Sequence, residues 1–166
     1  MDGLMPENSI NLSEQERRTI KRIFEYDISF VYERLLADKA IEKEDIPQLN
    51  HEFRKFITLA GLGIYPIAMI SPLIDEVWHQ FILFTKHYKE FCLSTVGHFI
   101  GHMPDTSLTP IPPVAGKNFM SGYMKYFGEL PPIWFKNMDQ ASLNYYAQAD
   151  FTYAPPKRWS GFAGPE

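Results

Sequence analysis

The chain has 166 residues, of which 45% are hydrophobic, and its formal net charge at pH 7 is −4. This length and composition suit one domain with an apolar core, and the negative charge argues against a nucleic-acid-binding protein, which normally has a basic surface. The longest apolar run is interrupted by Asp75, His79 and Lys86, so it falls short of the about 18 residues that cross a membrane. With one cysteine and no apolar leader, we expect a soluble cytoplasmic protein.

The first 40 residues predict an arm followed by a helix. Residues 1–11 are expected to be a loose arm. Ser13 and Glu16 match a capping box, and an apolar stripe at helical spacing predicts one helix that continues to about Asp38. Asp27 and Arg34 lie beside this stripe. Either they satisfy each other or nearby backbone groups in a buried network, or Asp27 faces a site.

Two further helical regions follow. One helix is expected after Asp45, with Pro47 in its first turn and an end at Gly61 to Gly63. The pair Ser71-Pro72 then predicts a helix start, because serine caps and proline fits the first helical position. This helix should run to about residue 84 or further, and a second helical piece should cover about 86–96, continuous with it or not.

The remaining chain is rich in proline and aromatic residues. Residues 105–116 contain three prolines and are expected to be a loop. A short helix is predicted over 118–127, a turn after Pro131-Pro132, and a last helix from Asp139 through Ala149. Residues 150–166 are expected to be an irregular aromatic tail. The whole pattern predicts an all-α single domain, residues 1–166, with about five to seven helices.

The stretch from Ser71 to Pro104 contains four of the five histidines and the single cysteine. Asp75 and His79 are four residues apart, so their side chains meet on one face of a helix. This face is either simply solvated, or it is part of a metal site that His102 or His98 completes from the glycine-bounded segment downstream. Two histidines and one carboxylate form the triad of non-haem iron enzymes, and zinc in such a site can activate water.

The other histidines and the cysteine favour simpler interpretations. His87 is rotated by about 80° from His79 on a continuous helix, which favours a surface or core position. His51 falls on the exposed face of its helix. Cys92 lies among apolar residues and is best read as a small buried hydrophobe. The alternative, a nucleophile, requires a lowered pKa and a nearby base.

The sequence also resembles a known family over about residues 50–135. The resemblance rests on the runs FRKFITLAGLG, SPLIDEVWHQFILFTKHYKEFC, GHFIGHMP and YMKYFGELPPIW. They resemble the glycine-rich domain-containing protein-like family, whose polar positions fall here on Asp75, Trp78, His79, Cys92 and His102. Relatives often have two adjacent histidines where this chain has Gly101 and His102, so the resemblance favours His102 as the ligand. The glycine-rich tail of the family is absent. The resemblance implies a motif and no settled activity.

These observations lead to two functional hypotheses. The first is a metal-binding helical protein, in its sharper form a metal-dependent enzyme, in which Asp75, His79 and His102 bind a divalent transition metal such as iron or zinc. His98 and Glu76 are the next candidate ligands. The second is a non-catalytic helical interaction module whose histidines form a buried hydrogen-bond network.

The enzyme hypothesis includes a substrate and the residues that contact it. The substrate would be a small molecule or a peptide, with no role for nucleic acid or a membrane. The candidate contacts are Trp78, Tyr88 and Arg54.

Overall fold

The structure is a computed structural model that describes residues 12–148. The predicted arm over 1–11 and the tail over 150–166 lie outside the described residues. The prediction of an all-α fold is confirmed: residues 12–148 form seven α-helices and two 3-10 helices, with no strand among them. In chain order these are α1 (Glu14–Glu25), α2 (Ser29–Ala37), η2 (Lys43–Asp45), α3 (Ile46–Gly61), α4 (Pro72–Leu83), α5 (Thr85–Thr95), α6 (Pro113–Phe127), η3 (Pro132–Phe135) and α7 (Gln140–Gln148).

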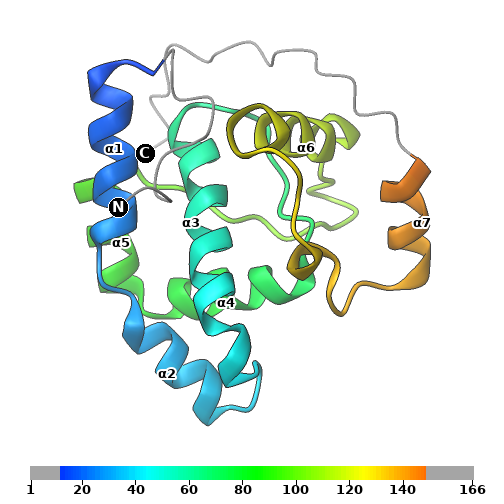
Figure 1. Cartoon of the computed structure of the whole chain (residues 1–166), viewed down its shortest axis with the longest axis horizontal. Helices are drawn as coiled ribbons and strands as arrows, with labels where there is room; N and C mark the ends of the chain where they lie inside the picture. The colour runs from blue at the N-terminus through cyan, green and yellow to red at the C-terminus, as the bar shows by residue number, and fades with distance from the viewer. Residues whose placement is uncertain (1–11, 149–166) are drawn as a thin grey trace.

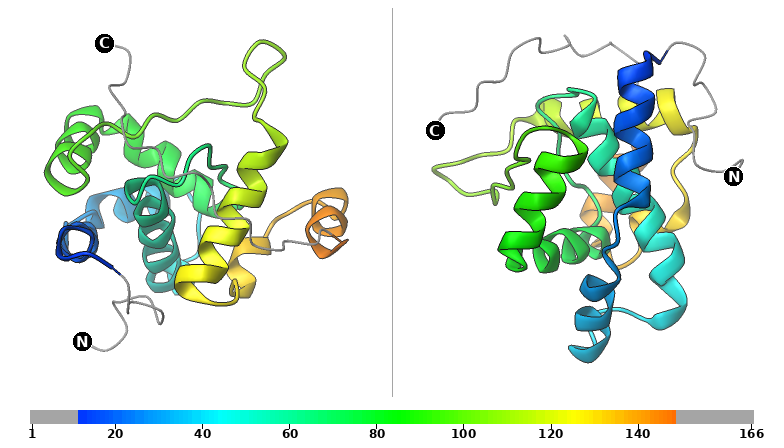
Figure 2. Two further views of the ribbon diagram at one scale, coloured as in Figure 1. Left: turned by 90° about the horizontal axis from the view of Figure 1, so that it is seen from above. Right: turned by 90° about the vertical axis from the view of Figure 1, so that its left-hand side faces the viewer.

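Helix α3 is the centre of the fold. It packs against α1, α4 and α6, and it lies between α1 and α6 in two perpendicular views (Figures 1 and 2). Its apolar side chains at helical spacing are fully buried, as the sequence pattern predicts. They are Leu49, Phe53, Phe56 and Ile57. None of the described helices combines the length and apolarity needed to span a membrane.

The prediction of a single helix up to Asp38 is wrong, because α1 ends before Tyr26 and a second helix, α2, begins at Ser29. Tyr26 has extended backbone angles, φ −67° and ψ 129°. The Asp27 carboxylate then accepts the backbone N–H of Ser29 at 2.9 Å. Asparagine and aspartate side chains commonly compete with helix hydrogen bonds in this way, so Asp27 redirects the chain.

Arg54, on the neighbouring helix α3, also stabilises the break between α1 and α2. Its guanidinium donates to the backbone carbonyls of Ile23 and Tyr26, the second at 2.9 Å, and so satisfies carbonyls at the end of α1. Arg34 instead donates to Asp38 at 2.8 Å. Asp27 and Arg34 are thus each satisfied locally and do not pair with each other.

Helices α4 and α5 follow the predicted pattern. The Ser71 hydroxyl accepts the N–H of Ile74 at 3.2 Å, and Pro72 occupies the first turn. The helix ends at Leu83, and Phe84 is both its C-cap and the N-cap of α5. The two pieces are therefore separate helices that pack against each other.

The predicted loop over 105–116 is shorter than expected, because α6 already begins at Pro113. Proline is well suited to the first helical turn, where its missing N–H has no partner to lose. The helix ends at Gly128, which has a positive φ of 80°. The turn after Pro131 is confirmed as η3, and Asp139 caps α7 by accepting the N–H of Ser142 at 2.9 Å.

Candidate metal centre

The side chains of Asp75 and His79 meet on one face of α4, as their spacing predicts. His79 Nε2 lies 3.5 Å from one carboxylate oxygen of Asp75. The side chain of His79 is about half exposed (49%) and that of Asp75 is less exposed (28%). The pair therefore lies at the surface, and the imidazole is the more exposed of the two side chains.

His102 reaches the same carboxylate from the segment between α5 and α6. Its Nε2 lies 2.9 Å from the other Asp75 oxygen, across 27 positions of sequence. Only 13% of the His102 side chain is exposed. The rings of His79 and His102 lie with centroids 4.6 Å apart, so both imidazoles flank Asp75.

The three side chains form a group with the geometry of a metal site. Each of Asp75, His79 and His102 offers one ligand atom, and these atoms all lie within 4.8 Å of one another. Two ligands that are each about 2.1 Å from a metal ion lie roughly 3–4 Å apart, so small side-chain movements bring all three into bonding distance. The donors, two imidazoles and a carboxylate, suit zinc or iron.

A chain of buried contacts holds His102 in place. The Trp78 ring lies against the His102 ring with centroids 4.2 Å apart. The Trp78 indole N–H donates to the Tyr88 hydroxyl at 2.9 Å, and that hydroxyl donates to the Ile100 carbonyl at 2.6 Å. Tyr88 is fully buried, and burial raises its pKa. These contacts fix the backbone two residues before His102, a supporting role beyond the substrate contact predicted for Trp78 and Tyr88, which stays a prediction.

The remaining candidates lie outside the three-residue group. Neither His98 nor Glu76 belongs to it; Glu76 is exposed on α4 and His98 is partly exposed. Arg54 is buried on α3, where it binds backbone carbonyls and Asn50. It lines a pocket that contains none of the three candidate ligands. A ligand role for His98 and a substrate role for Arg54 stay predictions.

The side chains interpreted as bystanders occupy ordinary packing positions. His87 lies against Phe30, and His51 lies edge-on to Phe24. Burial lowers the pKa of His51. Cys92 is completely buried, and burial raises the pKa of its thiol. A thiol of this kind is poorly suited to act as a nucleophile.

A buried polar cluster surrounds Glu52, which the sequence patterns above did not predict. This carboxylate is 2% exposed. It accepts the Trp134 indole N–H at 2.7 Å and the Tyr123 hydroxyl, and Lys55 lies 3.0 Å from its other oxygen. A signal was present: Glu52 lies three residues after Leu49, on the apolar face of α3.

Comparison with known proteins places the chain in a family. No curated protein and no solved structure matches the sequence, and no comparison names a glycine-rich domain family. The model of the UCP032817-like family matches residues 14–115, a stretch that includes all three residues of the candidate metal centre. Since this match covers more than half of the sequence, the chain belongs to the UCP032817-like family.

Proposed function

We propose that the chain binds a divalent transition metal ion through Asp75, His79 and His102. The observation that carries the proposal is the convergence of their three ligand atoms within 4.8 Å. Imidazole and carboxylate together favour zinc or iron over calcium and magnesium, which prefer oxygen ligands alone.

The openness of the site supports a metal-dependent enzyme. Structural zinc sites normally have four protein ligands, whereas catalytic sites keep at least one position for water or substrate. The group here would supply three ligands, and the side chain of His79 is half exposed, so water or a substrate could reach an ion held there. A bound zinc ion would activate water, and a bound iron ion would support oxygen chemistry. The substrate would be a small molecule or peptide that approaches from the His79 side.

The direct contact between Asp75 and His102 favours a second candidate function. Their 2.9 Å hydrogen bond satisfies both groups without a metal ion, and Trp78 covers the His102 ring. In this alternative the cluster is a structural hydrogen-bond network in a helical interaction module. Replacing His79 with asparagine would then change stability in the same way with and without metal.

Metal analysis tests the metal proposal. The protein is purified with its affinity tag removed, reconstituted with zinc or iron(II), and freed of loose metal by gel filtration. We expect one equivalent of metal in the wild type and a large loss in both His79→Ala and His102→Ala. His87→Ala is the matched control, because His87 is an exposed histidine outside the group. The proposal fails if the wild type holds no stoichiometric metal or if both variants keep it.

A chelator melt separates the two candidate functions. A ligand that binds only the folded state at a free concentration about 100 times its Kd adds roughly 3 kcal/mol to the free energy of unfolding. If metal binds, a chelator should therefore lower the melting temperature of the wild type and leave that of His102→Ala unchanged. An equal melting temperature with and without chelator supports the hydrogen-bond network.

A further inference from the structure

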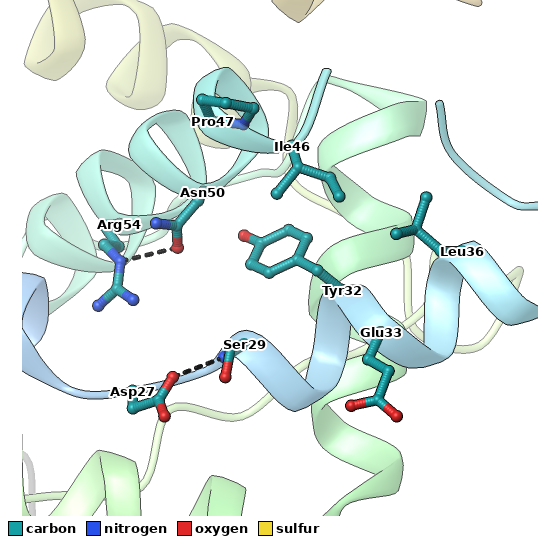
Figure 3. A pocket seen from close by; sticks show the side chains of 9 residues that line it. All are labelled: Asp27, Ser29, Tyr32, Glu33, Leu36, Ile46, Pro47, Asn50 and Arg54. Carbon is teal, nitrogen blue, oxygen red and sulfur yellow. Dashed lines mark hydrogen bonds between the residues drawn. The ribbon is translucent and has the colours of Figure 1, made fainter. Parts of the chain in front are cut away.

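A pocket distinct from the metal centre opens between α2 and the first half of α3 (Figure 3). It has a volume of about 520 Å³, within the roughly 300–1,000 Å³ that is common for small-molecule sites. Aliphatic side chains, Leu36, Ile46 and Pro47, line one end (Figure 3). The other end is polar and contains Arg54 and Asp27, so the pocket suits a ligand with an apolar part and a charged part.

Arg54 brings a buried positive charge to the polar end. The residue is 5% exposed, and burial lowers its pKa. Its Nε donates to the Asn50 side-chain oxygen at 2.9 Å, and its two other nitrogens donate to backbone carbonyls. Among the described residues no carboxylate forms an ion pair with it. Hydrogen bonds to ionised acceptors are roughly twice as strong as those to neutral ones, so a carboxylate is a better partner for Arg54 than the Asn50 amide.

Tyr32 provides a second, independent indication of a ligand. It is 5% exposed, and its hydroxyl has no hydrogen-bond partner among the described residues. The hydroxyl points into the space beside Asn50 and Arg54 (Figure 3). Burial raises its pKa, so it remains a protonated donor at neutral pH. Buried hydroxyls are nearly always hydrogen-bonded, and a group that displaces the Asn50 amide can supply the missing partner.

The other charged side chains that line the pocket are two carboxylates. Asp27 lines the pocket from the turn before α2, and Glu33 lines it from α2, with its carboxylate directed away from Tyr32 and Arg54 (Figure 3). The hydrogen bonds from Ser29 lower the pKa of Asp27, which keeps it ionised at neutral pH. These charges disfavour a dianion and favour a ligand with a positive group beside its carboxylate.

We propose that this pocket binds a small zwitterion, a free amino acid with an aliphatic side chain. Its carboxylate replaces the Asn50 side-chain oxygen as the acceptor of the Arg54 hydrogen bond, and it also accepts a hydrogen bond from the Tyr32 hydroxyl. Its ammonium group pairs with Asp27, and its side chain lies along Ile46 toward the aliphatic end. The site does not depend on the metal centre.

Calorimetric titration with leucine and two analogues tests the ligand class. Leucinamide lacks the carboxylate, and 4-methylpentanoate lacks the ammonium group. We expect saturable binding of leucine and affinities at least about tenfold weaker for both analogues, since each loses a charge-assisted hydrogen bond. Titrations in the presence of chelator, and with His79→Ala, should give the same leucine affinity. Absence of leucine binding, or equal binding of leucinamide, overturns the proposal.

Two variants assign the binding to this pocket without altering Arg54, which also stabilises the end of α1. Tyr32→Phe removes the unsatisfied hydroxyl, so the free protein should be at least as stable as the wild type while leucine binds about three- to tenfold more weakly. Asp27→Asn keeps an oxygen that can accept the Ser29 N–H. It should lower the affinity for leucine and leave the affinity for 4-methylpentanoate unchanged. Tyr145→Phe, at a half-exposed position on α7, is the control and should bind leucine normally. Wild-type leucine affinity in both pocket variants would show that the pocket is not the site.

Discussion

The indole N–H of Trp134 donates to the Glu52 carboxylate across 82 positions of sequence, at 2.7 Å. The Tyr123 hydroxyl donates to the same oxygen. One buried carboxylate on α3 therefore accepts hydrogen bonds from both α6 and η3. Glu52 is therefore a buried polar side chain that joins α3 to two elements far along the chain.

Replacing Glu52 should be strongly destabilising. Glu52→Ala leaves the Trp134 N–H without its acceptor and removes the carboxylate shared by Tyr123 and Lys55, which keep only the hydrogen bond between them. Breaking a buried charged network in this way typically costs about 3–5 kcal/mol. Urea unfolding should therefore show a clearly lower midpoint. The exposed Glu44→Gln is the control, with an expected change within about 0.5 kcal/mol. A wild-type midpoint for Glu52→Ala would mean that water satisfies these donors.

Tyr88→Phe should affect both stability and metal affinity. The change leaves the Trp78 N–H and the Ile100 carbonyl buried and unpaired, which costs about 1–3 kcal/mol. It also releases the backbone that carries His102, and loss of such supporting contacts commonly weakens metal binding by about 10–100-fold. Competition with a chromophoric chelator measures the second effect. Tyr145→Phe should change neither quantity. A Tyr88→Phe protein with wild-type metal affinity would show that the position of His102 does not depend on the Tyr88 hydroxyl.

Cys92 should react slowly with thiol reagents. Its side chain is completely buried and burial raises the pKa of the thiol, so little thiolate is present and little is accessible at pH 8. Labelling of the folded protein should therefore be much slower than labelling in denaturant, as followed by mass spectrometry. Fast labelling of the folded protein would contradict this prediction and support a role for Cys92 as a nucleophile.

The same raised pKa predicts a loss of stability at alkaline pH. A thiol in the unfolded chain ionises at about pH 8.5, whereas the folded state keeps the Cys92 thiol protonated to a higher pH. The contribution of Cys92 to stability is thus complete below pH 8.5 and declines as the pH rises toward the folded-state pKa. The stability difference between wild type and Cys92→Ala should shrink above this pH in urea titrations. A difference that is constant with pH contradicts the prediction.

The features predicted well from the sequence depend on neighbouring residues. Ser71 and Pro72 start α4 through local capping, and Asp75 and His79 meet because four residues make one helical turn. The break between α1 and α2 was missed since part of its stabilisation comes from Arg54, 28 residues beyond Tyr26. Helical periodicity continues across such a break and gives no sign of it.

The sequence predicts His102 as the third residue of the candidate metal group, and the structure brings it to Asp75 and His79, but the contacts that place His102 there could not be predicted. His102 follows Gly101 in a segment without regular structure, so no periodicity relates its position to that of Asp75. Its placement depends on the buried Tyr88 hydroxyl and the Trp78 ring. The early start of α6 is different, because Pro112-Pro113 was a usable local signal: proline favours the first helical turn.

The separation of the ligands along the chain has a mechanical consequence. Asp75 and His79 share one turn of α4, but 27 residues separate Asp75 from His102. A metal ion held by all three would close this loop in the manner of a disulfide, restricting the unfolded chain as well as joining folded parts. Unlike a disulfide, it could be formed or removed without oxidation. Metal supply would then set how firmly the segment between α5 and α6 is tied to α4, and proteolysis within that segment would report the state of the cross-link.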